Sequence, residues 1–516
     1  MPVPKIHLSI CVFLLCALGL TGAEPLRYPP GFGVVDVTQA PYHADASGAT
    51  DASAAIQQAI QDHHRRGNRI IYLPPGVYRI DQPVRWQHGS TLGPSLHGAG
   101  PAHTVLRVPA NTPAFADQDQ RHGVLYTGGG MSADRFCIDV ADLAIEVGAD
   151  NPGACGIQYM ANNQASLRNL HIRAAPNSGA VGIDMAHSDM VGPALISDVE
   201  VEGFAWGIRC AYSVNSQTFE RVTLRQQREG GLHNAGQVVT VRRLVSENRV
   251  PAVVTAAGTA STVLVDCDFT GGDPGAWAID NAAALWARDI SCSGYRGVLR
   301  DAAGEQTRVH EVPFIDEYVS GPSVSIFSGV ERSLRLPIQE TPQVAWGDVA
   351  DWINVADFGA IPGDKIDDTA AIQAAFDSGA ASVFLPASDT KRGYRIEGSI
   401  TIPVTLQRLI QGGGQWGGLD LIGAGEHGGL VIDGAGPPLL IERLTAWDVG
   451  GADRPLIQHL GSRSVVIAHV NTLLRDCALY VAEPGAGDLF LEDVACHWPM
   501  KSTVTWRWPN LRLAPG

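Results

Sequence analysis

Apolar and polar positions along this chain form two patterns, and the first of them occurs twice. From Asp51 the sequence is DASAAIQQAIQDHHRRGNRIIYLPPGVYRI, and from Asp367, 316 positions later, it is DDTAAIQAAFDSGAASVFLPASDTKRGYRI. Both copies place apolar residues on one helix face: Ala55, Ile56, Ala59 and Ile60, and Ala371, Ile372, Ala375 and Phe376. We predict a short helix in each copy, begun by Asp51 or Asp367, whose carboxylate accepts hydrogen bonds from the free N–H groups of the first turn.

Each predicted helix is followed by a short β-type run, Ile70 to Leu73 in the first copy and Ser382 to Leu385 in the second. Prolines interrupt both runs, and the β-type pattern resumes at Tyr78 and at Tyr394. A helix laid over the open end of a stack of strands would cover its unpaired edge. Two such caps predict two stacks.

The second pattern is a regular recurrence of short apolar segments between the two caps. Each segment is anchored by one apolar or thiol residue: Leu143, Leu170, Val199, Val222, Leu244, Cys267 and Ile290. Their spacings are 27, 29, 23, 22, 23 and 23, and a step of 22 to 23 residues is about one coil of a parallel β-helix. A β-sandwich with evenly spaced strands is the alternative, but its strands need not recur at a three-strand period.

The predicted fold is therefore all-β, with two tandem right-handed parallel β-helices, each beginning with a short capping helix. We assign residues 24–310 to the first β-helix, 311–350 to a proline-containing linker, and 351–516 to the second β-helix. About 120 residues follow the second cap, enough for roughly five coils at the same period, so the second β-helix should be short.

Residues 1–23 have the pattern of a signal peptide. Lys5 and His7 precede an apolar run from Leu8 to Leu20, and small residues follow up to Ala23. The run is shorter than the ~20 residues that a membrane-spanning helix needs. We therefore expect cleavage near Ala23, a secreted or periplasmic protein, and no membrane partner.

Charge and cysteine content narrow the classes of partner. The net charge of −16 argues against nucleic acid and favours neutral over acidic polymers. The seven cysteines beyond residue 23 are scattered, with no CxxC or Cys/His cluster, so we expect buried thiols with at most an incidental disulfide, no metal site and no cofactor. We expect a monomer.

Several stretches resemble known families. The cap with its LPPGVYRI strand resembles the N-terminal domain of the pectate-lyase superfamily. Three later stretches, ACGIQYMANNQASLRNLHI from Ala154, SVNSQTFERVTL from Ser213 and GDLFLEDV from Gly487, together with the two caps, resemble glycoside hydrolase family 55. The members of that family are double β-helix enzymes that cut β-1,3-glucan from its ends with inversion.

This resemblance implies specific roles. Gln164, and Gln217 with Phe219, match family positions that face the sugar-binding cleft. The family's EDV strand is present at Glu492, but the stretch that follows it in the family, which leads to acidic glutamates, is replaced here by STVTWRWPNLRLAPG. The resemblance thus implies either a β-1,3-glucan hydrolase or a catalytically incomplete relative that binds neutral β-glucan.

The residues themselves offer further candidates. Inverting hydrolysis needs two carboxyl groups ~6.5 to 9.5 Å apart. Asp184 and Asp189, in GIDMAHSDM, form a dense polar cluster, and Glu426 lies among glycines in GAGEHGG, although turn hydrogen bonding explains such acids equally well. Trp206, near Gly203 and Gly207, is a candidate platform for a sugar ring or a core residue.

Two other functions stay open from the sequence. A pectate-lyase-like or polygalacturonase-like enzyme would act on uronate polymers, and a lyase needs a base such as lysine or arginine. The first predicted β-helix contains no lysine, since Lys365 is the first after the signal peptide, so arginine would have to serve. A non-catalytic carbohydrate-binding β-helix is the other alternative.

Overall fold

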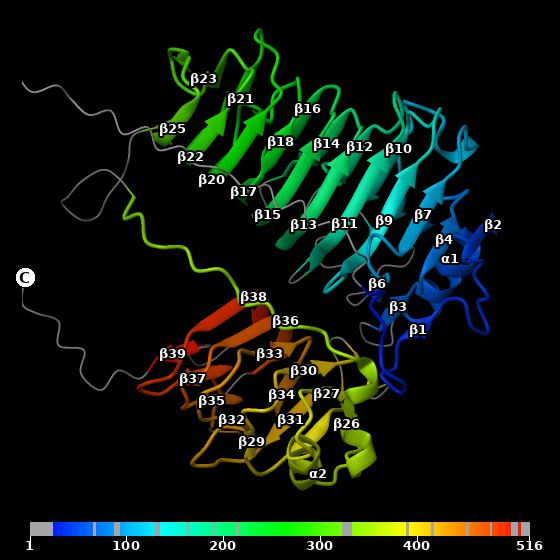
Figure 1. Ribbon diagram of the computed structural model, residues 1–516, viewed down its shortest axis with the longest axis vertical. Helices are drawn as coiled ribbons and strands as arrows, with labels where there is room; N and C mark the ends of the chain where they lie inside the picture. Colours follow the sequence, from blue (N-terminus) through cyan, green and yellow to red (C-terminus); the bar gives the residue numbers. More distant parts are fainter. Residues whose placement is uncertain are drawn as a thin grey trace, which may run out of the picture.

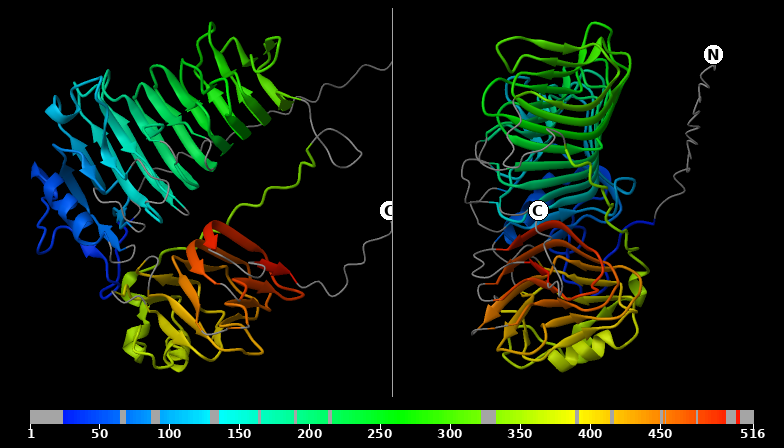
Figure 2. Two further views of the ribbon diagram at one scale, coloured as in Figure 1. Left: turned by 180° about the vertical axis from the view of Figure 1, so that it is seen from behind. Right: turned by 90° about the vertical axis from the view of Figure 1, so that its left-hand side faces the viewer.

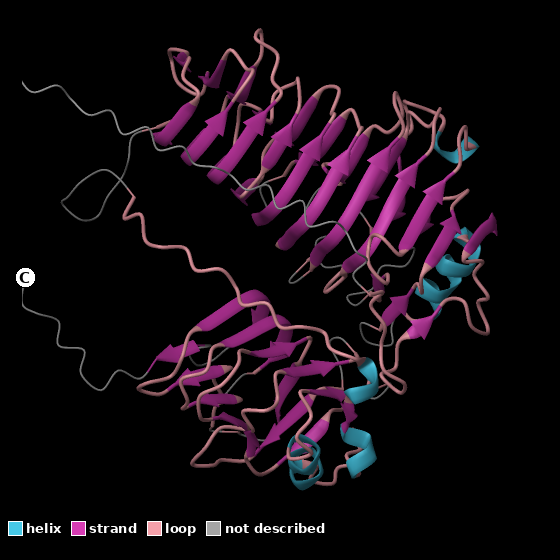
Figure 3. Cartoon of the chain, in the orientation of Figure 1, coloured by secondary structure: helices cyan, strands magenta, loops and turns pink. Residues whose placement is uncertain are grey.

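The computed structural model describes residues 24–496 and 504–506, with gaps at 65–68, 87–92, 129–134, 163–164, 189–190, 213–215, 322–332, 389–391, 414–416, 450–451, 453 and 475–476. The predicted signal peptide and the candidates Gln164 and Asp189 lie outside these residues. The regular secondary structure of the described chain is almost entirely strand, with a few short helices and many connecting loops (Figure 3). They form the two stacks that the sequence predicts (Figure 1).

The first stack contains a 15-stranded and a 10-stranded sheet. The larger sheet contains β1 (Val35–Asp36), β2 (Ser47–Asp51), β3 (Ile70–Tyr72), β4 (Gly76–Arg79), β6 (Ser95–His97), β7 (Thr104–Val108), β9 (Val140–Val147), β11 (Ser166–Ala174), β13 (Ala194–Glu202), β15 (Ser216–Arg225), β17 (Val238–Arg242), β18 (Val245–Glu247), β20 (Ser261–Thr270), β22 (Ala284–Cys292) and β25 (Phe314–Val319). The smaller sheet contains β5 (Val84–Arg85), β8 (His122–Tyr126), β10 (Ala154–Gln158), β12 (Val181–Met185), β14 (Trp206–Cys210), β16 (Gly230–Asn234), β19 (Val253–Thr255), β21 (Trp277–Asn281), β23 (Gly297–Asp301) and β24 (Arg308–His310).

The second stack contains a nine-stranded and a five-stranded sheet and is shorter, as expected. The larger sheet contains β26 (Ile353–Asn354), β27 (Ser382–Leu385), β28 (Tyr394–Ile396), β30 (Arg408–Gln411), β31 (Leu419–Ile422), β33 (Leu439–Glu442), β34 (Thr445–Val449), β36 (Val465–Leu473) and β38 (Leu489–Cys496). The smaller sheet contains β29 (Ile400–Ile402), β32 (Leu430–Ile432), β35 (Ile457–His459), β37 (Tyr480–Ala482) and β39 (Val504–Trp506). The helices are α1 (Ser53–Asp62) and α2 (Thr369–Phe376), with 3₁₀ turns η1 (Pro113–Phe115), η2 (Val349–Asp351) and η3 (Val355–Phe358).

The predicted period is confirmed by the strand register. Leu143 pairs with Leu170, Leu170 with Val199, and Val199 with Val222, in parallel ladders. These buried side chains stack along the first β-helix and form its core.

The residue before each anchor turns the strand through a corner. In the first β-helix these residues have φ between 50° and 61°: Asp142, Asn169, Asp198, Arg221, Arg243, Asp266 and Asp289. In the second the same position holds Arg443, His469 and Asp493, with φ between 52° and 56°. We call these two sets the first and second corner columns. Asp and Asn tolerate this left-handed conformation better than most residues, which explains their frequency there.

The two caps use the same hydrogen bonds. Oδ1 of Asp51 accepts from the backbone N–H of Ser53 at 3.0 Å, and Oδ1 of Asp367 accepts from that of Thr369 at 3.0 Å, as predicted. The structure places the N-cap one residue later in each copy, at Ala52 and Asp368, because the aspartate bonds the first helical residue from outside the helix.

A glutamine one turn further along each helix joins the cap to the sheets. Oε1 of Gln57 accepts from the backbone N–H of Arg85, and Oε1 of Gln373 accepts from that of Thr401, both at 2.7 Å. The two copies are thus equivalent in their contacts as well as in sequence.

The two β-helices meet at their N-terminal ends and diverge from there, in a V shape (Figures 1 and 2). An apolar cluster that includes Phe32, Tyr72, Trp352 and Phe384 packs at this junction. The ring centroids of Phe32 and Phe384 are 5.4 Å apart. Aromatic packing at one end therefore sets the angle at which the two β-helices face each other.

The segment assigned to the linker has two parts. Strand β25 (Phe314–Val319), within residues 311–350, pairs antiparallel with β22 and covers the C-terminal end of the first β-helix. The antiparallel pairing explains why this strand breaks the 22 to 23-residue period. Residues 333–348 run from the open end of the V along the second β-helix toward its N-terminal end (Figure 1).

Three consecutive linker residues contact both β-helices: the middle residue, Glu340, binds the first, and its neighbours Gln339 and Thr341 bind the second. The carboxylate of Glu340 accepts hydrogen bonds from Nη1 and Nη2 of Arg242 in the first β-helix, both at 2.7 Å. On either side, Gln339 donates to Asp488 at 2.9 Å and Thr341 donates to Glu492 at 2.5 Å in the second. The linker therefore ties the two walls of the V together.

The seven cysteines between residues 137 and 496 are free thiols, and six of them are buried. Among the described residues, no helix has the length and apolar character needed to span a membrane.

Candidate functional site: the cleft between the two β-helices

Two adjoining cavities of about 580 and 640 Å³ lie between the β-helices. Arg221, Thr341 and Glu492 line both of them, so the two cavities form one continuous cleft. The linker contributes Ile338 and Gln339 to one cavity and Pro342 through Val344 to the other.

The corner columns supply much of the polar wall. Asp142, Asn169, Asp198 and Arg221 line the larger cavity from the first β-helix. Arg443 and His469 line it from the second, and Asp493 lines the smaller cavity. Seven corner residues therefore line the cleft, and they come from αL positions of both β-helices.

Two half-buried carboxyl groups of the larger cavity have pKa values shifted in opposite directions. Burial raises the pKa of Asp142, and the nearby charge of Glu442 raises it further, although Arg168 and a hydrogen bond from Asn169 oppose this. Burial also acts to raise the pKa of Glu442, but the positive charges of Arg408 and Arg168 outweigh it and hold that pKa below its ordinary value. Asp142 therefore holds its proton to higher pH than an ordinary aspartate, and Glu442 stays charged to lower pH than an ordinary glutamate.

Glu442 is held in place by Arg408. Its Oε2 atom lies 2.6 Å from Nη1 of Arg408, and both side chains are largely buried. Nη2 of Arg408 donates to the backbone carbonyl of Val344 at 2.8 Å, and the guanidinium lies 4.7 Å from the ring centre of Trp346. The linker thus positions the arginine that positions Glu442.

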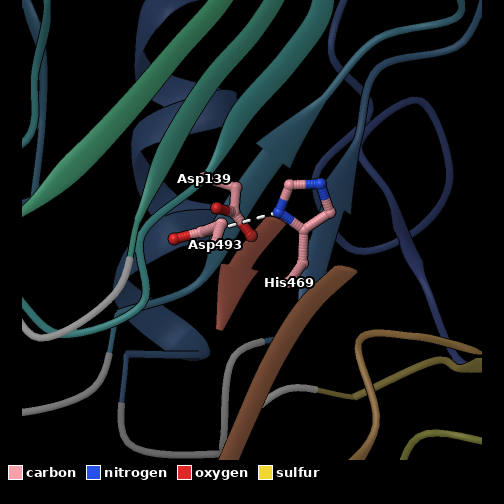
Figure 4. A group of neighbouring side chains, drawn as sticks. All are labelled: Asp139, His469 and Asp493. Carbon is pink, nitrogen blue, oxygen red and sulfur yellow. Dashed lines mark hydrogen bonds and ion pairs between the residues drawn. The ribbon is translucent and has the colours of Figure 1, made fainter. Parts of the chain in front are cut away.

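A buried group of Asp139, His469 and Asp493 joins the two β-helices beside this pair (Figure 4). Nδ1 of His469 lies 2.9 Å from Oδ2 of Asp493, and Nη1 of Arg443 lies 2.9 Å from Oδ2 of Asp139. Burial and the charge of Arg168 lower the pKa of His469 to about 3, so its imidazole is neutral at ordinary pH.

The donor atoms of this group are close enough to hold a metal ion. One atom from each of the three side chains lies within 4.8 Å of the others. However, Oδ1 of Asp139 already accepts from the N–H and the hydroxyl of Ser166, at 3.0 and 2.8 Å, and Oδ2 is paired with Arg443. The contacts fit a buried ion-pair network between the β-helices better than a cation site.

The site residues that the sequence suggests lie outside this cleft. Asp184 is buried on β12 in the smaller sheet, where its Oδ1 accepts from the N–H of Ala186 at 3.1 Å, as in a turn. Trp206 is half-buried, donates to Glu229 at 2.6 Å and packs on the ring of His233. Neither residue lines the cleft.

Gln217 and Glu426 are also outside the cleft wall. Gln217 is fully buried and donates to the carbonyl of Gly192 at 2.6 Å. Glu426 is exposed in a loop of the second β-helix. Their assigned roles stay predictions from the resemblance or from the motif alone.

The motifs in the sequence do not single out Asp142 or Glu442, although the sequence carries a signal for Asp142. The polar residue before each anchor, as in DLAI, NLHI and DVEV, recurs with the same period as the anchor. An Asp or Asn that recurs with the period of the coils indicates a position where the strand turns a corner. Successive corners stack on one another, so they lie along one face of the β-helix. The second β-helix repeats the signal before Leu444, Val470 and Val494.

Comparison with known families gives a partial match. The family model for rhamnogalacturonase A/epimerase, pectate lyase-like, matches residues 35–276, somewhat less than half of the chain. This match confirms the pectate-lyase-like character that the cap predicts. The family named is not family 55, so that resemblance stays a prediction.

The individual proteins that resemble this chain share little of its sequence. Alginate lyase 7 of Azotobacter vinelandii is 27% identical over 113 residues, which are 21% of this chain and 12% of that protein. The chain therefore matches only a small part of this curated relative. The catalytic unit of a GH87 α-1,3-glucanase from Streptomyces thermodiastaticus strain HF3-3 has a TM-score of 0.37 at 12% identity, covering 94% of this chain and 72% of that one. An iota-carrageenase bound to iota-carrageenan fragments has a TM-score of 0.31 at 12% identity, covering 45% and 59%.

Proposed function

We propose that this protein is a glycoside hydrolase that binds a polysaccharide in the cleft between its β-helices. The observation that carries the proposal is the pair formed by Asp142 and Glu442, which come from different β-helices and have oppositely shifted pKa values. Two carboxyl groups whose environments separate their pKa values are the usual basis for an acid and base assignment.

In this mechanism Asp142 is the general acid. Its proton goes to the glycosidic oxygen as the bond from that oxygen to the anomeric carbon breaks. Glu442 is the general base, which takes one proton from a water molecule while the water oxygen bonds to the anomeric carbon. Each turnover consumes one water and leaves one new reducing end.

The substrate that we propose is a neutral glucan. Several charged groups of the cleft wall are already paired, such as Arg221 with Asp198 at 2.7 Å and Arg408 with Glu442 at 2.6 Å. The resemblance to family 55 favours β-1,3 linkages and inversion. We also propose that the protein is secreted or periplasmic and that it acts as a monomer.

Elimination on a uronate polymer is the second candidate. It is favoured by the guanidinium of Arg168, which lines the larger cavity and would neutralise a substrate carboxylate. The short match to an alginate lyase agrees with this candidate.

The test is incubation of the purified protein with laminarin, alginate and polygalacturonate. Reducing ends measure hydrolysis, and ultraviolet absorbance measures unsaturated uronates. We expect reducing ends from laminarin without absorbance. Unsaturated products from either uronate polymer would favour the lyase, and binding of laminarin without products would indicate a non-catalytic β-helix.

A further inference from the structure

Arg168 differs from the other arginines of the cleft. Arg221, Arg242, Arg408 and Arg443 each lie within 3.2 Å of a carboxylate oxygen. Arg168 has no carboxylate within ion-pair distance among the described residues. Its Nε donates to the hydroxyl of Ser166 at 3.0 Å, which fixes the direction of the guanidinium and leaves the two Nη groups without a described partner.

Arg168 lies at the centre of the charged groups of the cleft. It is half-buried on β11, it lines the larger cavity, and its charge acts on both Asp142 and Glu442. Arg168 therefore lines the same cavity as the proposed acid and base.

His97 is a second side chain of this wall with unused hydrogen-bonding capacity. It is 3% exposed and lines the larger cavity. Its Nδ1 lies 2.7 Å from the hydroxyl of Tyr28, whereas Nε2 has no hydrogen-bond partner among the residues that the structure describes.

The favoured tautomer of His97 is the one that leaves fewer buried polar groups of His97 and Tyr28 without a hydrogen-bond partner. If the hydroxyl of Tyr28 donates to Nδ1, only the Nε2–H of His97 lacks a partner. If Nδ1–H donates instead, both the hydroxyl proton of Tyr28 and the lone pair of Nε2 lack partners. Each unsatisfied buried polar group destabilises the fold, so the first arrangement, which has fewer of them, is favoured.

We propose that Arg168 and His97 form a donor subsite that holds neighbouring hydroxyl oxygens of one neutral sugar residue beside Asp142 and Glu442. This inference rests on the proposed function and names the substrate class of that same site. Both side chains offer only N–H donors, so the ligand atoms must be acceptors.

The surrounding charges decide between a neutral and an acidic sugar. The guanidinium groups of Arg168, Arg408 and Arg443 are balanced by the carboxylates of Asp139, Glu442 and Asp493, while Asp142 is protonated in its proposed role. A carboxylate on the sugar would therefore add an unbalanced negative charge, whereas hydroxyl oxygens accept hydrogen bonds without adding charge. The subsite should therefore prefer a neutral hexose to a uronate.

Calorimetric binding of laminari-oligosaccharides and of matched oligouronates to the full chain tests this inference. Arg168→Gln is compared with Arg221→Gln, because Arg221 lines the same cavity but is already paired with Asp198. We expect Arg168→Gln to weaken laminari-oligosaccharide binding at least about tenfold and Arg221→Gln less than threefold. Equal effects of the two substitutions, or tighter binding of oligouronates by the unaltered chain, would overturn the inference.

A second measurement separates this inference from the proposed function. Nitrogen NMR of histidine-labelled protein reports which ring nitrogen of His97 carries the proton, with His97→Phe identifying the signal. We expect Nε2–H in the free protein and a shift of this signal when the oligosaccharide binds. A proton on Nδ1 would refute the subsite even if the enzyme is active, whereas binding of no glycan at all would refute the proposed function itself.

Discussion

Asp142 and Glu442 face one cavity from two different β-helices, and the charge of Glu442 contributes to the raised pKa of Asp142. The two residues are 300 positions apart in the sequence. Their proximity depends on the V-shaped arrangement of the two β-helices, so the acid and base exist as a pair only in the assembled fold.

The pH dependence of hydrolysis should follow from these two shifts. Glu442 must be charged, and its pKa is lowered, so activity should persist to lower pH than an ordinary glutamate allows. Asp142 must be protonated, and its pKa is raised, so activity should fall as pH increases through that value. The rate profile of kcat/KM should be bell-shaped with an acidic optimum. A profile that rises through neutral pH would contradict these roles.

Replacement of Asp142 by Asn should stabilise the protein at neutral pH. A carboxyl group with a raised folded-state pKa stabilises the fold below its unfolded-state pKa, and this contribution is lost as pH rises. Asn keeps the acceptor for Asn169 and tolerates the αL corner, but carries no charge. The melting temperature of Asp142→Asn should exceed that of the unaltered chain at pH 7 and approach it at low pH. A lower melting temperature at pH 7 would be inconsistent with this explanation.

The buried ion pair between the β-helices should matter for stability. Asp139→Asn removes the 2.9 Å ion pair between Asp139 and the buried guanidinium of Arg443, and breaking a buried ion pair typically costs about 3–5 kcal/mol. Asp198→Asn breaks an exposed pair with Arg221 and should cost about 0–1 kcal/mol. Urea unfolding measures both. Equal costs would show that Asp139 does not hold the β-helices together.

The linker contact of Glu340 should restrain the open side of the V. Glu340→Ala removes hydrogen bonds to Arg242 and an ion pair with Arg243. The pair is exposed, so we expect at most about 1 kcal/mol of lost stability, but faster proteolytic cleavage within residues 333–348. Glu311→Ala is the control, because Glu311 forms a comparable exposed pair with Arg296 within the first β-helix. The same cleavage rate in both variants would argue against a tether.

The sequence predicted the fold because the fold follows from local repetition. Val199 and Val222 each bury the same face of a coil, and their spacing of 23 residues reveals the period directly. The caps are equally local, since Asp51 and Gln57 contact residues of their own coil.

The site depends on contacts that no local pattern contains. Glu442 and Asp142 line one cavity because the two β-helices pack together at the junction that includes Phe32 and Phe384. The motif acids Asp184 and Glu426 have polar or glycine-rich neighbours, and turns share this feature with active sites. The corner position of Asp142 was present in the sequence as a period, but its facing partner was not.

Hydrolysis by Asp142→Asn, compared with Asp198→Asn, tests the central claim most directly. Both residues are aspartates of the first corner column and line the same cavity, and Asn preserves the corner conformation in each. On the polysaccharide that the unaltered chain cleaves, we predict that Asp142→Asn lowers kcat/KM by about 10² to 10⁴. Asp198→Asn should change it by less than about threefold. Retention of activity by Asp142→Asn, or equal losses in both variants, would contradict the assignment of the cleft acid.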